Sequence, residues 1–166
     1  MSSGIKGIEP VIAAMQARLS ADLPAEILVA NDDADDGLVL DVPAHVLDYI
    51  PAVGELRDFP TVGLLHGAGT FEDDSAVSAT GVYSIGIVTF VQQAEPDLLA
   101  RALRRYTRSI LRVALKNRAI QGGPWGMILQ SVDYGPALAD VPEGGGPPTR
   151  YIAWSTVQIQ CRQDEE

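Results

Sequence analysis

The chain has 166 residues, of which 46% are hydrophobic and 20% charged, and its formal net charge is −10 at pH 7. This composition predicts one folded domain, because enough apolar surface is present to offset the entropy lost on folding. The acidic balance disfavours phosphate backbones and anionic lipids as partners. No apolar run approaches the roughly 18 residues that cross a bilayer. A single cysteine, Cys161, and an N-terminus without a secretory pattern predict a soluble protein of a reducing compartment.

The first part of the chain begins with a helical pattern. Apolar residues spaced by three and four positions predict an amphipathic helix that ends before Pro24: Ile5, Ile8, Val11, Ile12, Met15 and Leu19. Residues 26–30 are then predicted as a short strand, and residues 31–37 as an acidic surface loop. A second short strand is expected at 38–40, followed by a helical turn at 44–50 between two prolines.

The middle of the chain is predicted to be extended. Residues 59–65 form an apolar strand pattern, and the acidic segment 72–75 is expected to be a loop after it. Residues 81–91 are rich in valine, isoleucine, threonine and aromatic residues, which favours a strand inside a sheet.

A long helix is predicted from Pro96 to about Arg118. Pro96 and Asp97 suit the first helical turn, because proline lacks only an N–H that has no helical partner there and aspartate faces the positive end of the dipole. Residues 122–124 are expected to end the helix. The stripe expected to face the core is Leu99, Leu103, Tyr106, Ile110 and Val113.

The last elements are two predicted strands, 127–134 and 150–161, separated by a glycine- and proline-rich hairpin-like excursion at 144–148. Strands that follow one another with few crossover helices favour antiparallel pairing. The sequence therefore predicts an α+β fold over residues 1–166. A mainly antiparallel or mixed β-sheet is flanked by an N-terminal helix and a long central helix.

Residue types that bind metals are few and poorly spaced. His45 and His66 have no second histidine or cysteine at zinc-ligand spacing. A calcium-loop register that starts at Asn31 would place Asp36 where glycine is needed and Val42 where a bidentate glutamate belongs. These patterns predict no metal site.

Catalytic patterns are also missing from the sequence. It contains no G-x-S-x-G elbow, and Cys161 has no histidine near it in the chain. The glycines at 67–69 and 144–146 lack the lysine of a phosphate-binding loop. We therefore predict no catalytic residue and no cofactor.

Basic residues concentrate in the long helix of this otherwise acidic chain, and five of them share one stripe: Arg101, Arg105, Arg108, Arg112 and Lys116. One interpretation is a solvated face paired with local acids, such as Asp97 with Arg101. Another is a subunit interface, in which this stripe meets an acidic loop of a neighbouring subunit. The candidate acids are Asp32, Asp33, Asp35 and Asp36 in one loop, and Glu72, Asp73 and Asp74 in the other. Direct contact with DNA is a third alternative.

Several segments together resemble the tail terminator family of long-tailed bacteriophages. They are the N-terminal helix that ends at Leu23-Pro24, the strand entry Phe59-Pro60-Thr61-Val62, the strand Gly81-Val82-Tyr83-Ser84-Ile85-Gly86-Ile87, and the helical segment Arg104-Arg105-Tyr106-Thr107-Arg108-Ser109-Ile110. The likeness covers nearly the whole chain, and it depends on the order of elements as much as on any one motif.

This resemblance implies a mixed sheet flanked by helices and assembly into a hexameric ring. Such a ring caps the tail tube, stops its polymerisation and offers a surface for head attachment. The implied partners are other copies of the chain, the major tail tube protein and the head-to-tail connector or stopper. DNA would pass through the ring without sequence-specific binding, and no membrane is implied. The implied location is the head-proximal end of the virion tail, with assembly in the host cytoplasm.

Three other functions remain alternatives. A head-to-tail stopper or other neck protein shares the size, acidity and ring-forming habit of a terminator. An oligomeric enzyme would require a polar cluster between chains, for which only loop acids are candidates. A nucleic-acid-binding module would use the arginine stripe, but no set of stacking aromatic residues accompanies it.

Overall fold

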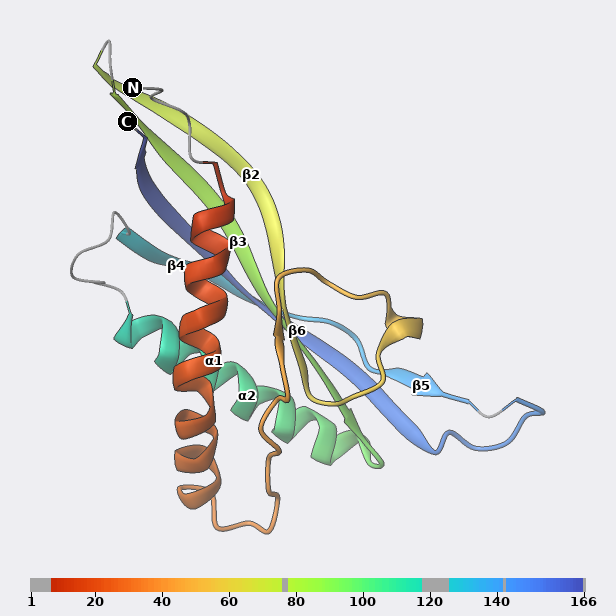
Figure 1. Ribbon diagram of the computed structural model, residues 1–166. Helices are drawn as coiled ribbons and strands as arrows, with labels where there is room; N and C mark the ends of the chain where they lie inside the picture. Colours follow the sequence, from red (N-terminus) through yellow and green to blue (C-terminus); the bar gives the residue numbers. More distant parts are fainter. Residues whose placement is uncertain (1–6, 76–77, 118–125, 142, 166) are drawn as a thin grey trace.

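A computed structural model describes residues 7–75, 78–117, 126–141 and 143–165. Two helices pack on one face of a six-stranded mixed sheet (Figure 1), which confirms the predicted α+β fold with its N-terminal and central helices. The elements, in chain order, are α1 (Glu9–Asp32), β1 (Val46–Leu47), a 3₁₀ turn (Val53–Glu55), β2 (Thr61–Ser75), β3 (Ser78–Gln93), α2 (Pro96–Lys116), β4 (Gly126–Tyr134), β5 (Leu138–Asp140) and β6 (Arg150–Glu165).

The sheet has the order β1-β2-β3-β6-β4, and β5 pairs with the end of β6 that β4 leaves free. The β1–β2 pair is parallel, whereas β2–β3, β3–β6, β4–β6 and β5–β6 are antiparallel. The last strand of the chain therefore lies inside the sheet. Among the described residues, β4 and β5 form one outer edge.

Helix α1 is longer than the sequence predicts, because it continues through Pro24 to Asp32. The predicted end before Pro24 and the predicted strand at 26–30 are both wrong. An internal proline costs a helix about 3 kcal/mol. The apolar stripe continues past it, however, with Leu23 1% and Ile27 0% exposed. Full burial of such a side chain contributes about 1.5–3 kcal/mol, so packing of this stripe outweighs the local preference.

The segment between α1 and β1, residues 33–45, lies along α2, and we call it the strap. It contains no strand at 38–40, contrary to prediction. The side-chain amide of Asn31 replaces a neighbouring strand there: it accepts a hydrogen bond from Leu40 N at 2.7 Å and donates one to Leu40 O at 3.0 Å. The predicted helical turn at 44–50 is also wrong. None of its residues is helical, and Val46 and Leu47 form β1, in which Val46 pairs with Val62 of β2.

Strands β2 and β3 are longer than predicted. The strands expected at 59–65 and 81–91 are present, but the acidic segment 72–75 is not a loop and continues β2, where Glu72 pairs with Thr80 of β3. A bulge lies between His66 and Gly69. Pairing with β3 supplies hydrogen-bond partners for the backbone of this acidic segment, which was predicted to be a solvent-exposed loop.

Helix α2 agrees closely with prediction. Pro96 lies in its first turn, Lys116 in its last, and all five residues of the predicted core stripe are buried. Residues 122–124, predicted to end the helix, lie outside the described residues.

The strands predicted at 127–134 and 150–161 are confirmed as parts of β4 and β6. Strand β5 was not predicted. It pairs with β6 through Leu138 and Ile152, so the glycine-rich excursion joins two antiparallel strands, as expected of a hairpin. Gly144, Gly145 and Gly146 all have positive φ, which glycine adopts without strain.

The core lies between the two helices and the face of the sheet that carries Ile85, Ile87, Val157 and Ile159. Within this core, a pair of hydroxyl groups links α2 to β6. Thr107 Oγ1 donates to Leu103 O at 2.8 Å and lies 2.8 Å from Ser155 Oγ, and both side chains are buried. This contact adds a polar link between α2 and β6 to the apolar packing of the buried stripe of α2.

Candidate functional site

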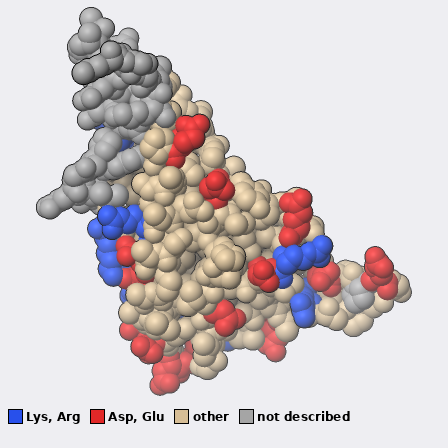
Figure 2. Space-filling view, viewed as in Figure 1, with Lys and Arg blue, Asp and Glu red and all other residues tan. Residues whose placement is uncertain are grey.

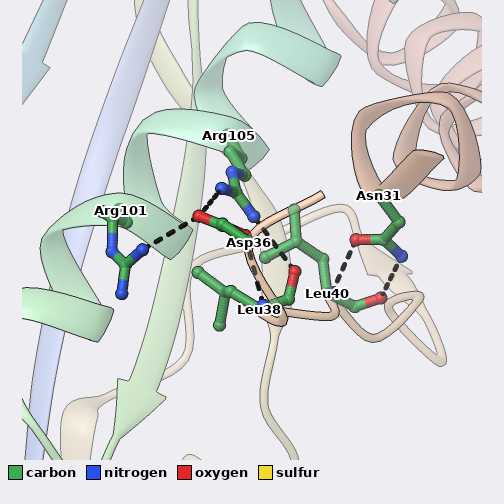
Figure 3. Close-up of polar contacts among 6 residues, drawn as sticks. All are labelled: Asn31, Asp36, Leu38, Leu40, Arg101 and Arg105. Carbon is green, nitrogen blue, oxygen red and sulfur yellow. Dashed lines mark hydrogen bonds and ion pairs between the residues drawn. The ribbon is translucent and has the colours of Figure 1, made fainter. Parts of the chain in front are cut away.

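Asp36 in the strap joins two arginines of α2 (Figure 3). Arg101 Nη1 donates to its carboxylate at 2.9 Å, and Arg105 donates to the same oxygen. Arg105 also donates to Leu38 O at 3.0 Å, while Leu38 N donates to the other carboxylate oxygen at 3.2 Å. The hydrogen bond from Arg105 holds the pKa of Asp36 below its ordinary value. These contacts fasten the strap to the helix.

A second contact fastens the strap to α2 at Tyr106, the residue after Arg105. Tyr106 Oη donates to Asp41 O at 2.7 Å. Burial raises the pKa of this phenol far above its usual range, so the group stays protonated and remains a donor. Together with the amide of Asn31, this hydrogen bond satisfies strap backbone groups that lack strand partners.

The other end of α2 meets a carboxylate from α1. Glu26 has a side chain only 6% exposed, and it accepts a hydrogen bond from Lys116. Arg112 Nη1 lies 3.8 Å from Glu26, and its Nη2 lies 3.5 Å from Asp33. A buried carboxylate is stable only when cations or donors compensate its lost hydration. Arg112 and Lys116 provide this compensation.

These contacts change the interpretation of the arginine stripe. Four of its five members form ion pairs within the chain. Arg101, Arg105, Arg112 and Lys116 pair with acids of the same chain, which come from α1 and the strap rather than from the local pair Asp97–Arg101. Figure 2 shows the same tendency, with basic side chains in small groups beside acidic ones.

Two cations of α2 differ from these four. Arg104 and Arg108 are exposed, and within the described part of the chain neither forms an ion pair. They lie one helical turn apart. Of the predicted stripe, Arg108 is thus the member still free to meet another molecule, and Arg104, which we left out of the stripe, is the second.

The predicted interface acids also divide into two groups. Asp36 and Asp33 are engaged within the chain, whereas Asp32, the last residue of α1, and Asp35, in the strap, are exposed. Glu72 is exposed on β2. Asp73 and Asp74 belong to β2 by their backbone, and their side chains lie outside the described set. A role for the remaining acids between subunits stays a prediction.

Two surface features were not predicted from the sequence. The first is the β2 edge, residues 65–72, all of which are exposed. Strand β1 covers only Val62 and Gly63, so in the described part of the chain no strand pairs with the outer side of this edge. Phe71 is 50% exposed there and packs edge-on against Tyr83, with ring centroids 6.1 Å apart.

The glycines of this region make room for the aromatic pair. A Cβ at Gly69 would lie 2.9 Å from the Tyr83 ring, and one at Gly81 would lie 2.7 Å from it. Real Cβ contacts are not this short, so both positions require glycine for the ring to lie across the strands. In the sequence, Gly81 two residues before Tyr83 was the local signal for this arrangement, whereas Gly69 comes from the neighbouring strand β2.

The second feature is a groove of about 390 Å³ between the N-terminal half of α2 and the β4–β5 edge. Its lining is mostly apolar, with Arg104 as its one charged residue: Pro96, Leu99, Ala100, Leu103, Arg104, Tyr134, Gly135, Ala137 and Ala153. No sequence motif marks such a groove, because its walls come from three separate segments.

The residues considered for metal binding and nucleophilic chemistry lie apart. No group of three histidine, cysteine, aspartate or glutamate side chains within the described ranges could hold a metal ion. His66 Nε2 lies 2.8 Å from Asp48 O, and His45 is exposed elsewhere. Burial raises the pKa of Cys161 to about 11, which keeps this thiol protonated at neutral pH. No helix among the described residues is long and apolar enough to cross a membrane.

Comparison with known proteins adds no assignment. A scan against protein-family models finds no match. A search of curated proteins finds no significantly similar sequence.

Proposed function

We propose that this chain is a structural subunit of a phage tail, a tail terminator that assembles into a ring on the tail tube. The observation that carries this proposal is that, among the described residues, two edges of the sheet have no strand paired on their outer side. The β2 edge exposes Leu65 and Phe71, and the opposite edge exposes Ile128, Tyr134 and Leu138. Exposed edges with apolar side chains are templates for pairing with another chain.

Three of the four segments that carry the family resemblance support the proposal by their position, whereas the fourth, a helix that ends at Leu23-Pro24, does not, because α1 continues to Asp32. Residues 59–62 enter β2, residues 81–87 lie in β3 and residues 104–110 lie in α2. The three elements are neighbours, since β2 pairs with β3 and α2 packs on β3. The resemblance thus falls on one connected unit of the fold rather than on scattered loops.

A terminator acts by binding rather than by chemistry. It stops the tube by occupying the growing end more tightly than another tube subunit does, which is competition for one surface. Its partners in this proposal are other copies of itself, the major tail tube protein and the head-to-tail connector, with DNA passing through the ring. Its place in the virion is the head-proximal end of the tail.

Electron microscopy of lysates made without this protein tests the function. A terminator's absence leaves tails of uncontrolled length. Tails of normal length beside unattached heads would replace this proposal with a head-to-tail stopper. Normal particles would exclude both functions.

A further inference from the structure

We infer that the β2 edge of one copy of this chain docks beside the α2 groove of a second copy, with Phe71 entering the groove. The inference rests on the proposed function, because it names the contact through which subunits associate. It begins from two features that have no partner among the described residues: a free strand edge carrying a half-exposed phenylalanine, and an apolar groove bordered by another free edge.

The two features are chemically complementary. The groove has an apolar lining, and Arg104 at its side lacks an ion-pair partner in the described part of the chain, as does Arg108 on the next turn. In the sequence, Phe71 is followed by three consecutive acids, Glu72, Asp73 and Asp74. An aromatic side chain followed by carboxylates fits an apolar groove beside two arginines, because burial supplies affinity and charge supplies direction.

The backbone is complementary as well. The groove borders on Tyr134, Gly135 and Ala137, which belong to the outer edge formed by β4 and β5. A strand added at this edge would pair with backbone groups that now have no strand partner, as in β-strand addition between proteins. Phe71 and Tyr83 lie on the helix-covered face of the sheet, as their ring contact and the place of Tyr83 in the core show. When β2 of one copy adds antiparallel to β4 of the second, both helix-covered faces lie on the same side of the continued sheet, and Phe71 is directed toward α2 of the second copy.

The contact cannot form within one chain. Phe71 pairs opposite Gly81 of β3, whereas Ala153 of the groove pairs opposite Val91 of β3. These β3 positions are ten residues apart, from 81 to 91, which corresponds to roughly 30 Å along a strand. An edge and a groove at opposite ends of one rigid sheet can meet only between copies. Such a head-to-tail contact either closes into a ring or continues as a filament.

Cysteine crosslinking tests the contact directly. Thr70→Cys, which leaves the neighbouring Phe71 in place on the exposed β2 edge, and Ala100→Cys are made in separate full-length chains, mixed, and treated with a short thiol crosslinker. A dimer that contains one copy of each variant is expected. The matched control is Leu28→Cys, exposed on α1, mixed with Ala100→Cys, and it should remain at background. The native Cys161 is 1% exposed and does not compete.

Charge reversal provides the second arm. Arg104→Glu in the Ala100→Cys chain should reduce its crosslink to the Thr70→Cys chain at least tenfold, whereas Arg18→Glu, an equal charge change at an exposed position of α1, should leave it unchanged. Mixing also tests the head-to-tail geometry. The Phe71→Ser chain has an intact groove but a defective β2 edge, and the Arg104→Glu chain has an intact β2 edge but a defective groove. Each variant alone should therefore stay monomeric in sedimentation velocity. In the mixture only one contact can form, so the mixture should give dimers and nothing larger.

Two results would overturn the inference. One is an assembled ring, free or on tail tubes, that gives no crosslink between Thr70→Cys and Ala100→Cys. In that case the ring and the terminator function would stand, and only the contact would be wrong. The other is a chain that gives no crosslink and no oligomer, free or on tubes. Tail length in lysates without the protein remains a separate test of function.

Discussion

Thr89 provides a direct test of how hydrogen bonding holds this core together. Its side chain is 0% exposed, and its Oγ1 has no hydrogen-bond partner among the described residues. A buried polar group left without a partner costs about 1–3 kcal/mol. Valine has nearly the shape of threonine and suits a strand. We therefore expect Thr89→Val to raise the free energy of unfolding by about 1 kcal/mol, or the melting temperature by about 2–4 °C.

The same substitution at Thr107 should have the opposite sign, and it is the matched control. Thr107 Oγ1 donates to Leu103 O and lies 2.8 Å from Ser155 Oγ. Valine at this position removes both contacts and leaves the buried Ser155 hydroxyl without this partner. We expect a loss of about 1–2 kcal/mol, since a hydrogen bond is removed and a polar group is stranded.

Urea titrations of the three proteins at neutral pH measure both effects. The midpoints should move in opposite directions while the slopes stay equal, which would show that stability rather than compactness has changed. If Thr89→Val unfolds at the same or a lower urea concentration than the wild type, its hydroxyl has a partner and the reasoning is refuted. If the urea midpoints of both variants move in the same direction, side-chain shape rather than hydrogen bonding determines the stability change at these two sites.

Three further predictions concern the strap, α2 and the sheet edge. Arg105→Glu should destabilise the fold because it places two negative charges together at Asp36, whereas Arg108→Glu should change stability by less than about 0.5 kcal/mol; equal urea midpoints would contradict this. Because the pKa of Asp36 is lowered in the folded state, its stabilising contribution is complete above the unfolded pKa of about 3.9 and is lost as pH falls through the lower folded pKa. The difference in unfolding free energy between wild type and Asp36→Asn should therefore narrow below about pH 4. A difference that stays constant with pH would show that the ion pairs of Asp36 with Arg101 and Arg105 do not stabilise the fold. Gly135→Ala should cost about 1–3 kcal/mol, since its Cβ would lie 2.1 Å from Trp154 Cε2; an unchanged urea midpoint would show that the ring moves aside freely.

The sequence predicts most accurately the elements whose local signals agree with their packing. Helix α2 has proline at its start, an unbroken apolar stripe and a basic last turn, and the structure places it within two residues of the prediction. Helix α1 is the contrary case. Pro24 is a local signal to stop, and only burial of residues on both sides of it, Leu23 and Ile27, keeps the helix continuous. Nothing in the sequence alone indicates that this burial occurs.

The candidate site shows the same limit at longer range. The arginines of α2 were visible as a stripe, but their partners Asp36 and Glu26 are 65 to 90 residues away in the chain. No local pattern joins residues at such distances. The candidate interface therefore changes from the whole predicted stripe to Arg104 and Arg108, which form no ion pair in the described part of the chain. The groove beside Arg104 depends on three segments that meet only in the folded chain.

The position of β6 has a consequence for biosynthesis. This strand, residues 150–165, follows every other described element in the chain, yet it lies between β3 and the β4–β5 edge. While a ribosome is still producing it, β3 and β4 have no partner on that side, and the helices cover an incomplete sheet. Unpaired apolar strands of this kind attract other chains. The nascent chain therefore reaches its native pairing only after β6 has been synthesised, and a product truncated before residue 150 would be prone to aggregate.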